Sequence, residues 1–279
     1  ESFSSNNTRR QLIGNVITRL YTDSQGYIWV GTMTGLSGLN SRTLKFDRYN
    51  VLGEVTAIAE VGEREIWVAA DNLFRIRDGQ VSRVDEIKES VSQIAVTPEH
   101  VWVSSSRYLY KLARNGQLDK ISLPADLAQH PVYDLLWQNG VMYLASEQGY
   151  YLVDTAGQVQ PANLPMDRGV PVYQLHSDSQ GGDWVSSYDK LFYRHQQQQW
   201  QVISRDELGS ATQFNDIFED RQQNVWLGSF GDGLYRVSRG KIKRVIGQSQ
   251  RDVMVRSVVR TTVDALLIAS SQRLGLLDK

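Results

Sequence analysis

The sequence predicts an all-β chain folded as a single seven-bladed β-propeller, and three observations lead to that prediction. A short motif centred on a large, mostly aromatic residue recurs seven times along the 279 residues. The spacing between copies runs from 35 to 42 residues and averages about 40, the repeat length of propeller blades. Around each copy, short runs alternate apolar with polar residues, as half-buried strands do. The repeats account for all of residues 1–279, which we expect to form one domain.

A large side chain at the second position of the motif marks the second strand of each blade. That residue is Trp in five copies, Tyr143 in the fourth copy and Leu267 in the seventh. In a propeller, a bulky residue at this point fills the space between neighbouring sheets. The copies are IWVGT (28–32), IWVAA (66–70), VWVSS (101–105), MYLAS (142–146), DWVSS (183–187), VWLGS (225–229) and LLIAS (266–270).

Three further short strands are expected around each copy. Upstream, two apolar residues separated by two variable ones, as in Ile17–Leu20, predict the first strand. Downstream, an alternating run such as Gly35–Asn40 predicts the third strand. A tight hairpin follows, and the pairs Asp78–Gly79 and Asn115–Gly116 suit the positive φ angles of a two-residue type I′ turn. A fourth strand then completes an antiparallel meander.

The two ends of the chain are expected to share the last blade. The seventh repeat ends with RLGLLDK and contains three strands of its own. Phe3 stands where the aromatic residue of a fourth strand would stand, by comparison with Phe46. Residues 1–5 are therefore predicted to form the outer strand of the last blade and so to close the ring.

Composition excludes several kinds of function. A net charge of −1 lacks the basic footprint that nucleic-acid binding needs, so no nucleic-acid partner is expected. Because the chain has no cysteine, disulfides, thiolate metal sites and cysteine nucleophiles are excluded. No stretch approaches the roughly 18–20 apolar residues of a membrane-spanning helix.

An Asp opens the turn before the tryptophan strand in three repeats, at Asp23, Asp178 and Asp220. A calcium loop of the helix-loop-helix type needs several oxygen ligands and a bidentate Glu at its twelfth position, and these are not arranged here. An Asp side chain that opens a turn accounts for the recurrence, with Gly taking the positive φ angle where it follows. We therefore expect structural hairpins, and neither a cofactor nor a metal ion.

The four histidines lie in different blades without the spacing of zinc ligands. Only His130 is expected near the surface that would face a ligand. The four are His100, His130, His176 and His195.

Two repeats resemble a known family closely. Residues 17–40 (ITRLYTDSQGYIWVGTMTGLSGLN) and residues 214–237 (FNDIFEDRQQNVWLGSFGDGLYRV) resemble the two-component regulator propeller repeat of bacterial sensor proteins, and residues 172–194 resemble it in part. In that family, such propellers form the periplasmic input region of membrane-spanning histidine kinases, hybrid kinases or diguanylate cyclases. Two propellers usually occur in tandem, followed by a β-sandwich and a membrane helix.

The resemblance implies a non-catalytic sensor domain excised from a longer signalling protein. It would be periplasmic and attached to the membrane only through a downstream helix, and it could form a homodimer in the full-length protein. Its partner would be a small molecule or glycan, or a periplasmic protein.

Residue types differ from repeat to repeat at the positions expected to line the mouth of the central channel, where propellers usually bind ligands. These are the starts of the first strands and the loops between second and third strands. An ordinary wet channel with internal salt bridges would also account for the mixture of aromatic, acidic and basic residues there. The expected ligand-binding residues are Arg19, Arg107, Tyr133, Asp134, Tyr173, Tyr188, Asp189, Asn215, Asp216, Phe230, Asp232 and Arg256.

Two other functions fit the same scaffold. Streptogramin lyases have a similar seven-bladed form and use histidine with a divalent metal, so a metal-dependent lyase or hydrolase is one alternative. A protein-interaction scaffold is the other. In that case Tyr133, Tyr173, Tyr188 and Phe230 would form an interface patch.

Overall fold

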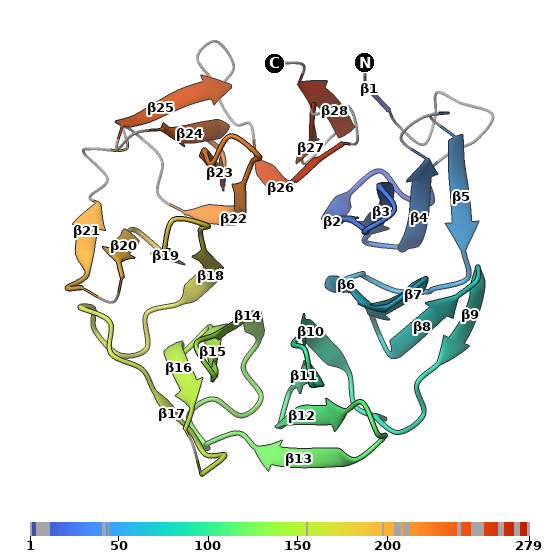
Figure 1. The fold of residues 1–279 in the computed structure, drawn as a ribbon, viewed down its shortest axis with the longest axis horizontal. Helices are drawn as coiled ribbons and strands as arrows, with labels where there is room; N and C mark the ends of the chain where they lie inside the picture. Colours follow the sequence, from blue (N-terminus) through green and yellow to red (C-terminus); the bar gives the residue numbers. More distant parts are fainter. Residues whose placement is uncertain are drawn as a thin grey trace. The chain divides into compact units, whose positions relative to one another are not determined.

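The structure is a computed structural model whose described residues form seven four-stranded antiparallel sheets (Figure 1). The fold class is the seven-bladed β-propeller that the repeat predicts. The described residues are 2–3, 12–40, 43, 45–154, 156–196, 198–203, 208, 213–238, 241–246, 254–261, 265–270 and 274–277.

The chain divides into two compact units, which we describe separately. The first unit comprises Glu1–Ser106, Tyr110–Asp119 and Arg256–Lys279, and the second comprises Arg107–Leu109 and Lys120–Val255. Blades 1, 2 and 7 belong essentially to the first unit and blades 4, 5 and 6 to the second, while the chain changes units within blade 3.

Each blade is a meander whose strands pair in chain order. Blade 1 holds β2 (Ile17–Thr22), β3 (Tyr27–Thr32), β4 (Gly35–Asn40) and β5 (Lys45–Tyr49). Blade 2 holds β6 (Ala57–Gly62), β7 (Glu65–Ala69), β8 (Leu73–Arg77) and β9 (Gln80–Arg83). Blade 3 holds β10 (Val91–Val96), β11 (His100–Ser105), β12 (Tyr108–Ala113) and β13 (Leu118–Ser122).

The next three blades repeat the same order. Blade 4 holds β14 (Val132–Gln138), β15 (Val141–Ser146), β16 (Gly149–Val153) and β17 (Val159–Pro161). Blade 5 holds β18 (Val172–Ser177), β19 (Gly182–Ser187), β20 (Leu191–His195) and β21 (Gln201–Ile203). Blade 6 holds β22 (Phe214–Glu219), β23 (Val225–Ser229), β24 (Leu234–Ser238) and β25 (Lys241–Ile246).

Blade 7 is completed by the N-terminus, as the sequence predicts. It holds β26 (Val255–Arg260), β27 (Leu266–Ser270), β28 (Leu274–Leu277) and β1 (Ser2–Phe3), in that order. Strand β1 runs antiparallel to β28, with Ser2 opposite Gly275 and Phe3 opposite Leu274. The other residues of the predicted closing strand (1, 4 and 5) lie outside the described residues.

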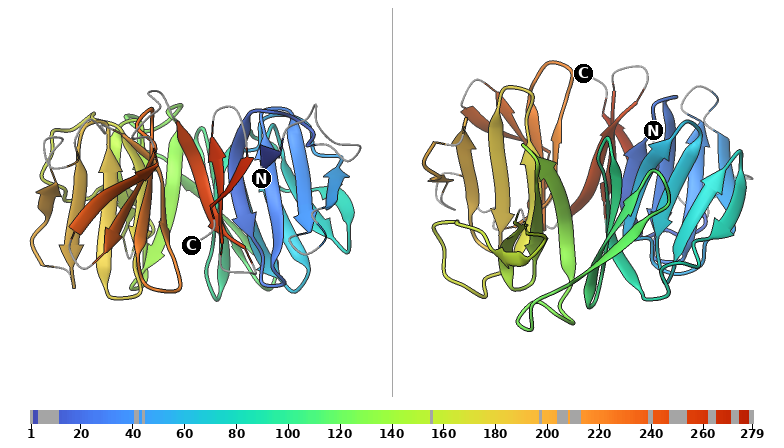
Figure 2. Two further views of the ribbon diagram at one scale, coloured as in Figure 1. Left: turned by 90° about the horizontal axis from the view of Figure 1, so that it is seen from above. Right: turned by 60° about the horizontal axis from the view of Figure 1, so that its bottom comes forward.

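Strands alternate in direction, so every blade has two distinct ends (Figure 2). We call one the hairpin end, because it carries the connections from first to second and from third to fourth strand. We call the other the loop end, because it carries the turn between second and third strands and the segment that enters the first strand.

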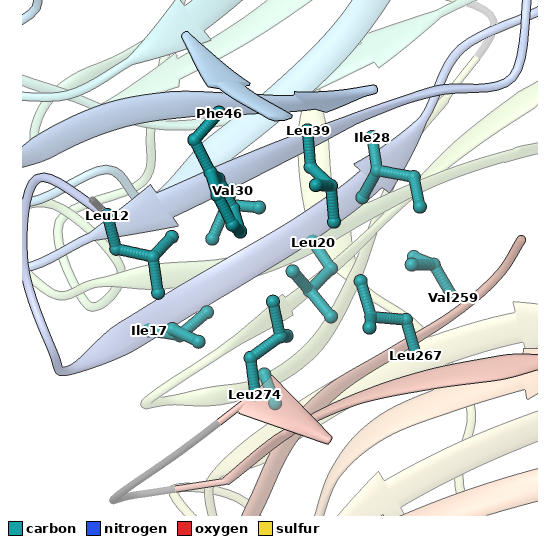
Figure 3. Packing of buried hydrophobic residues seen from close by; sticks show 11 residues of the cluster. Leu12, Ile17, Leu20, Ile28, Val30, Leu39, Phe46, Val259, Leu267 and Leu274 are labelled. Carbon is teal, nitrogen blue, oxygen red and sulfur yellow. The ribbon is translucent and has the colours of Figure 1, made fainter. Parts of the chain in front are cut away.

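Apolar side chains of the second strands pack between adjacent sheets. Figure 3 shows one such cluster in the first unit, built from blade 1 and blade 7. Leu267, which takes the place of tryptophan in blade 7, is 1% exposed and packs with Ile28 and Leu20 in this cluster. Fully burying a leucine stabilises a fold by about 1.5–3 kcal/mol, so the substitution keeps the core filled.

The Asp that opens the hairpin of blade 1 is structural, as predicted. Asp23 accepts backbone hydrogen bonds at Oδ1 from Gln25 (3.0 Å) and Tyr27 (2.9 Å). Its Oδ2 accepts the indole N–H of Trp29 at 2.9 Å. One carboxylate therefore closes the turn and satisfies the polar atom of a buried aromatic residue.

We call this pair of contacts, which joins the turn and the indole through one carboxylate, the Asp–Trp lock. It recurs in blades 5 and 6. Trp184 donates to Asp178 and Trp226 donates to Asp220, both at 2.8 Å. The lock explains why Asp and Trp are found six residues apart in these repeats.

The type I′ prediction is right at one hairpin and wrong at another. Asp78 (φ 48°) and Gly79 (φ 78°) both have positive φ. At Asn115–Gly116 only the glycine does, with φ 90°. There the Asn115 Oδ1 accepts the backbone N–H of Gln117 at 3.0 Å, which stabilises a longer turn with a single left-handed residue.

Candidate functional site

The first strand of five blades carries a β-bulge at its second residue. In each of them, pairing with the second strand skips one position near the loop end. A bulge leaves one residue out of the ladder and re-aims its side chain. The bulged residues are Thr18, Ser92, Tyr133, Tyr173 and Asn215.

Two of the bulged residues join neighbouring blades. The Thr18 hydroxyl donates to the Val55 carbonyl at 2.6 Å, and the Asn215 amide donates to the Val255 carbonyl at 3.2 Å. Val255 begins β26, the first strand of the following blade, and Val55 lies two residues before β6. At Thr18 and Asn215 the bulged residue therefore bonds to the next blade, whereas the Ser92 hydroxyl lies 2.8 Å from that of Ser104 within blade 3.

The residue after the bulge has a related role at two of the expected ligand-binding positions. Arg19 donates from Nε to the Thr56 carbonyl at 2.8 Å. Asp134 accepts the backbone N–H of Leu175 at 2.9 Å. Like Asn215, these side chains connect the first strand of one blade to the next blade, Arg19 at the residue before β6 and Asp134 at Leu175 in β18.

Blades 4 and 5 place tyrosines at the bulge instead. The rings of Tyr133 and Tyr173 lie 5.3 Å apart at 39°, and both residues are half-buried. Burial raises the pKa of both phenols, and Glu147 contributes in the same direction to each. Both side chains therefore stay neutral at physiological pH and offer an aromatic face together with a hydroxyl.

The first residue of the turn between second and third strands is presented outward in several blades. Its backbone N–H donates to the residue that precedes the first strand, as in Glu147 to Pro131 (3.1 Å) and Tyr188 to Pro171 (3.2 Å). Phe230 occupies the same place in blade 6. Tyr188 is 62% exposed and Phe230 is 52% exposed, so two aromatic side chains project from the loop end of the second unit.

A polar group adjoins the tyrosine pair in blade 4. His130 Nδ1 lies 2.8 Å from a carboxylate oxygen of Glu147. The amide nitrogen of Gln148 lies 3.2 Å from the same ring nitrogen. Glu147 therefore connects the imidazole to the surroundings of Tyr133 and Tyr173, whose pKa values it raises.

A cavity of about 600 Å³ opens beside Gln148 within the second unit. Its volume falls in the range of small-molecule sites. Tyr151 donates to the Asp126 carboxylate at 3.1 Å on its wall. Burial and that carboxylate raise the pKa of Tyr151 to about 12, while Arg168 partly opposes the shift. The wall thus carries the negative charges of Asp126 and Asp167 and the positive charge of Arg168.

The remaining expected residues are placed as follows. Asp232 forms an ion pair with Arg244 at 2.5 Å and accepts a hydrogen bond from Tyr235, so it is tied within blade 6. Arg107 and Asp189 are exposed, and Asp216 is half-buried in β22. Arg19 and Arg256 belong to the first unit.

The structure therefore brings together Tyr133, Tyr173 and Tyr188 on blades 4 and 5. Tyr188 is linked to the pair because it contributes to the raised pKa of Tyr173. We call these three tyrosines, with His130 and Glu147, the tyrosine face. Gln148 was not among the expected residues, although it directly follows Glu147 in the same loop.

The described residues contain no group of three or more His, Asp or Glu side chains arranged to hold a metal ion. Within the same part of the chain, no helix has the length and apolar character needed to cross a membrane.

The match to a family model falls on the first repeat. Residues 11–34 match the two-component regulator propeller. The resemblance read from residues 17–40 is confirmed at this repeat. A comparison with curated proteins found no match.

Among solved structures, the chain is similar to the extracellular domain of the one-component system BT4673 of B. thetaiotaomicron (12% identity, TM-score 0.82). That alignment covers 100% of this chain and 40% of the other. The extracellular domain of the hybrid two-component system BT3049 from the same organism is 15% identical, with a TM-score of 0.77 over 95% of this chain and 40% of the other.

Virginiamycin B lyase of Staphylococcus aureus is also similar in fold. It is 11% identical, with a TM-score of 0.77 over 99% of this chain and 97% of the lyase. Because all three identities are low, these similarities show the propeller fold alone. The chain spans only 40% of the length of the two extracellular domains.

Proposed function

We propose that this chain, whose residues 11–34 are a two-component regulator propeller repeat, is a non-catalytic ligand-sensing input domain of a bacterial membrane-bound signalling protein. One observation carries the proposal. The bulge position that joins blades through Thr18 and Asn215 is occupied in blades 4 and 5 by Tyr133 and Tyr173, whose rings pack together at the loop end. The first-strand bulge there presents an aromatic surface.

The chemistry of the tyrosine face suits a polar small molecule or a short glycan. Neutral phenols offer flat apolar faces for sugar rings and hydroxyls for hydrogen bonding. The Glu147 carboxylate and the His130 ring add an acceptor and a second hydrogen-bonding group beside the pair. A few convergent polar groups next to aromatic surface are typical of small-molecule sites.

The signalling role rests on the resemblance to extracellular sensor domains. In this proposal the domain lies outside the cytoplasm, in the periplasm, and the membrane helix and the kinase or cyclase output belong to other parts of the protein. A ligand would act by its different affinity for two arrangements of the domain with its neighbours or with a second copy in a homodimer.

A thermal-shift screen with mono- and oligosaccharides, followed by calorimetric titration of any hit, tests the proposed face. In the double variant Tyr133→Ala/Tyr173→Ala, we expect at least about tenfold weaker binding, because the aromatic contact area is removed. The matched control is Thr18→Ala/Ser92→Ala, which truncates two bulged residues outside the expected ligand-binding set. Unchanged affinity in the tyrosine variant, or an equal loss in the control, would remove the tyrosine face as the binding site.

Exposed aromatic residues favour a protein partner as the second candidate. Tyr188 and Phe230 project from neighbouring blades of the second unit, and aromatic residues are enriched at protein interfaces. Crosslinking of the domain to other periplasmic proteins should then depend on Tyr188 and Phe230 and remain unaffected by sugars. The lyase alternative has support from the fold alone.

A further inference from the structure

A second recess lies in the first unit, at the hairpin end of blades 1 and 2. It has a volume of about 270 Å³. Its wall in blade 1 includes Tyr27, Trp29 and Tyr49. We call this recess the hairpin groove. Its size suits one side chain or a small organic group, below the range of drug-sized ligands.

The aromatic wall of the hairpin groove is held in a fixed arrangement. Trp29 lies 5.2 Å from Tyr27 and 4.8 Å from Tyr49, measured between ring centroids. The Tyr27 hydroxyl donates to Asp47 at 2.8 Å and lies 3.3 Å from the hydroxyl of Tyr49. Burial raises the pKa of both tyrosines, so the phenols remain neutral. The groove therefore presents preorganised aromatic surface.

Carboxylates outnumber cations around that surface. Asp23, Glu60 and Asp78 line the groove, against the single guanidinium of Arg64. The hydrogen-bond donors to Asp23 are backbone N–H groups and an indole. Those to Glu60 are the backbone N–H and hydroxyl of Ser24. These neutral donors orient the two carboxylates and leave their negative charge in place.

The opposing cation is weakly held. Arg64 lies 3.8 Å from Asp78, and its side chain is 71% exposed. Such exposed pairs contribute little to stability, so the guanidinium is free to move aside at small cost. Displacing it would leave aromatic faces bordered by carboxylates, which is the arrangement that attracts an organic cation.

Blade 5 contains a close internal counterpart. Ser179 contacts Glu219 through its backbone N–H at 2.8 Å and its hydroxyl at 2.6 Å, the same two distances found between Ser24 and Glu60. We call each of these contacts a serine–glutamate clasp. The aromatic positions differ. Gly182 stands where blade 1 has Tyr27, and Ile203 stands where blade 1 has Tyr49. The acidic clasp is thus common to both places. Blade 5 keeps one aromatic neighbour of its tryptophan, Tyr193 at 4.4 Å between ring centroids, whereas in blade 1 Tyr27 and Tyr49 both pack on Trp29.

We propose that the hairpin groove binds an alkylammonium group, with Tyr27 and Tyr49 in contact with the cation and Glu60 and Asp23 supplying the opposite charge. The group could belong to a free diamine or to a lysine side chain of a protein. The site lies on the first unit and involves none of the residues of the tyrosine face. Failure of one proposal therefore leaves the other standing.

The experiment is titration of the purified domain with 1,5-diaminopentane, monitored by NMR of the Trp29 indole, with 1,5-pentanediol as the uncharged probe of similar length. We expect saturable binding of the diamine that weakens as salt rises, and no comparable binding of the diol. Glu60→Gln should weaken diamine binding by about fivefold, and Tyr49→Ile, which copies blade 5, by a similar factor. Glu219→Gln breaks the equivalent clasp and should leave diamine affinity unchanged.

A lysine-containing peptide with a blocked N-terminus distinguishes the two sources of the cation. Stronger binding of the peptide than of the diamine identifies a protein lysine, and the reverse order identifies a free amine. Equal binding of diol and diamine overturns the proposal, and so does an equal loss of affinity in Glu60→Gln and Glu219→Gln. Absence of binding by both diamine and peptide at millimolar concentration overturns it as well.

Discussion

Blade 1 and blade 5 are built from the same parts and differ in what surrounds them. Both carry the lock between Asp and Trp, and both clasp the following blade through a serine and a glutamate. At the loop end, blade 5 has Tyr173 and Tyr188 where blade 1 has Thr18 and Met33. At the hairpin end the difference is reversed, because blade 1 has Tyr27 and Tyr49 where blade 5 has Gly182 and Ile203.

The comparison separates two classes of position. Contacts that recur in both blades close turns and join sheets, so they hold the fold in place. Side chains that change between the blades are the ones that create surfaces. A search for function in a repeat protein should therefore begin where structurally equivalent residues differ in size and chemistry.

The largest change in stability is expected when the lock between Asp and Trp is removed. Asp23→Ala, Asp178→Ala and Asp220→Ala should each lower the free energy of unfolding by about 2–3 kcal/mol, because each leaves a buried indole N–H and several turn amides without their acceptor. Asp220 is 4% exposed, so its variant should lose the most. Urea denaturation followed by tryptophan fluorescence measures the change. A loss below about 0.5 kcal/mol in all three would mean that the lock does not stabilise the blades.

A smaller effect is expected where blade 1 has a glycine and blade 5 a serine. A Cβ on Gly31 would lie 2.6 Å from Cγ1 of Val55, so Gly31→Ala should cost about 1–3 kcal/mol of stability through overpacking. In blade 5, Ser186 fits because its hydroxyl donates to the Phe214 carbonyl at 3.0 Å.

Adding Val55→Ala to Gly31→Ala should cost less than the sum of the two single losses, because the second change removes Cγ1, the nearer of the two Val55 atoms that a Cβ at residue 31 would meet. A double-mutant cycle of unfolding free energies tests this coupling. Strict additivity of the two changes would contradict the packing explanation.

The repeat in the sequence was sufficient to predict the fold. Trp29 and its counterparts mark the second strand of every blade, and Phe3 indicated that the two ends of the chain share the last sheet. The bulges could not be predicted in this way. A pattern of two apolar residues separated by two variable ones, such as Val132–Leu135, shows which residues are apolar, but not that two residues of one strand oppose one residue of the next. The bulge decides that Tyr133 leaves the ladder.

Two other features lay outside the repeat pattern. Asp183 stands where most other blades have Ile, Val or Met. Its burial is explained by Arg194 on the next strand, at 2.8 Å, and by hydrogen bonds from Gln138 and Ser177. The cavity beside Gln148 is lined by the segment from Pro161 to Gly169, which has no periodic pattern from which a position could be read.

The smallest expected effect is on the pH dependence of stability, and it again distinguishes blade 5 from blade 1. Blade 5 has His176 at the first-strand position of Tyr21 in blade 1. Its Nε2 is buried without a hydrogen-bond partner among the described residues. Burial lowers the pKa of His176, while Glu219 and Asp178 partly oppose that shift.

Because the folded protein disfavours protonation of His176, the unfolded chain binds the proton more readily. The contribution of His176 to stability is therefore fully present above the unfolded pKa of about 6.5 and declines as the pH falls through that value, until the folded form also protonates. Urea unfolding between pH 7.5 and 5 should show this decline. His176→Gln should flatten the curve in this range, because glutamine does not titrate. The same decline in wild type and His176→Gln would assign the pH dependence to other groups and leave the difference between Tyr21 and His176 without a consequence for stability.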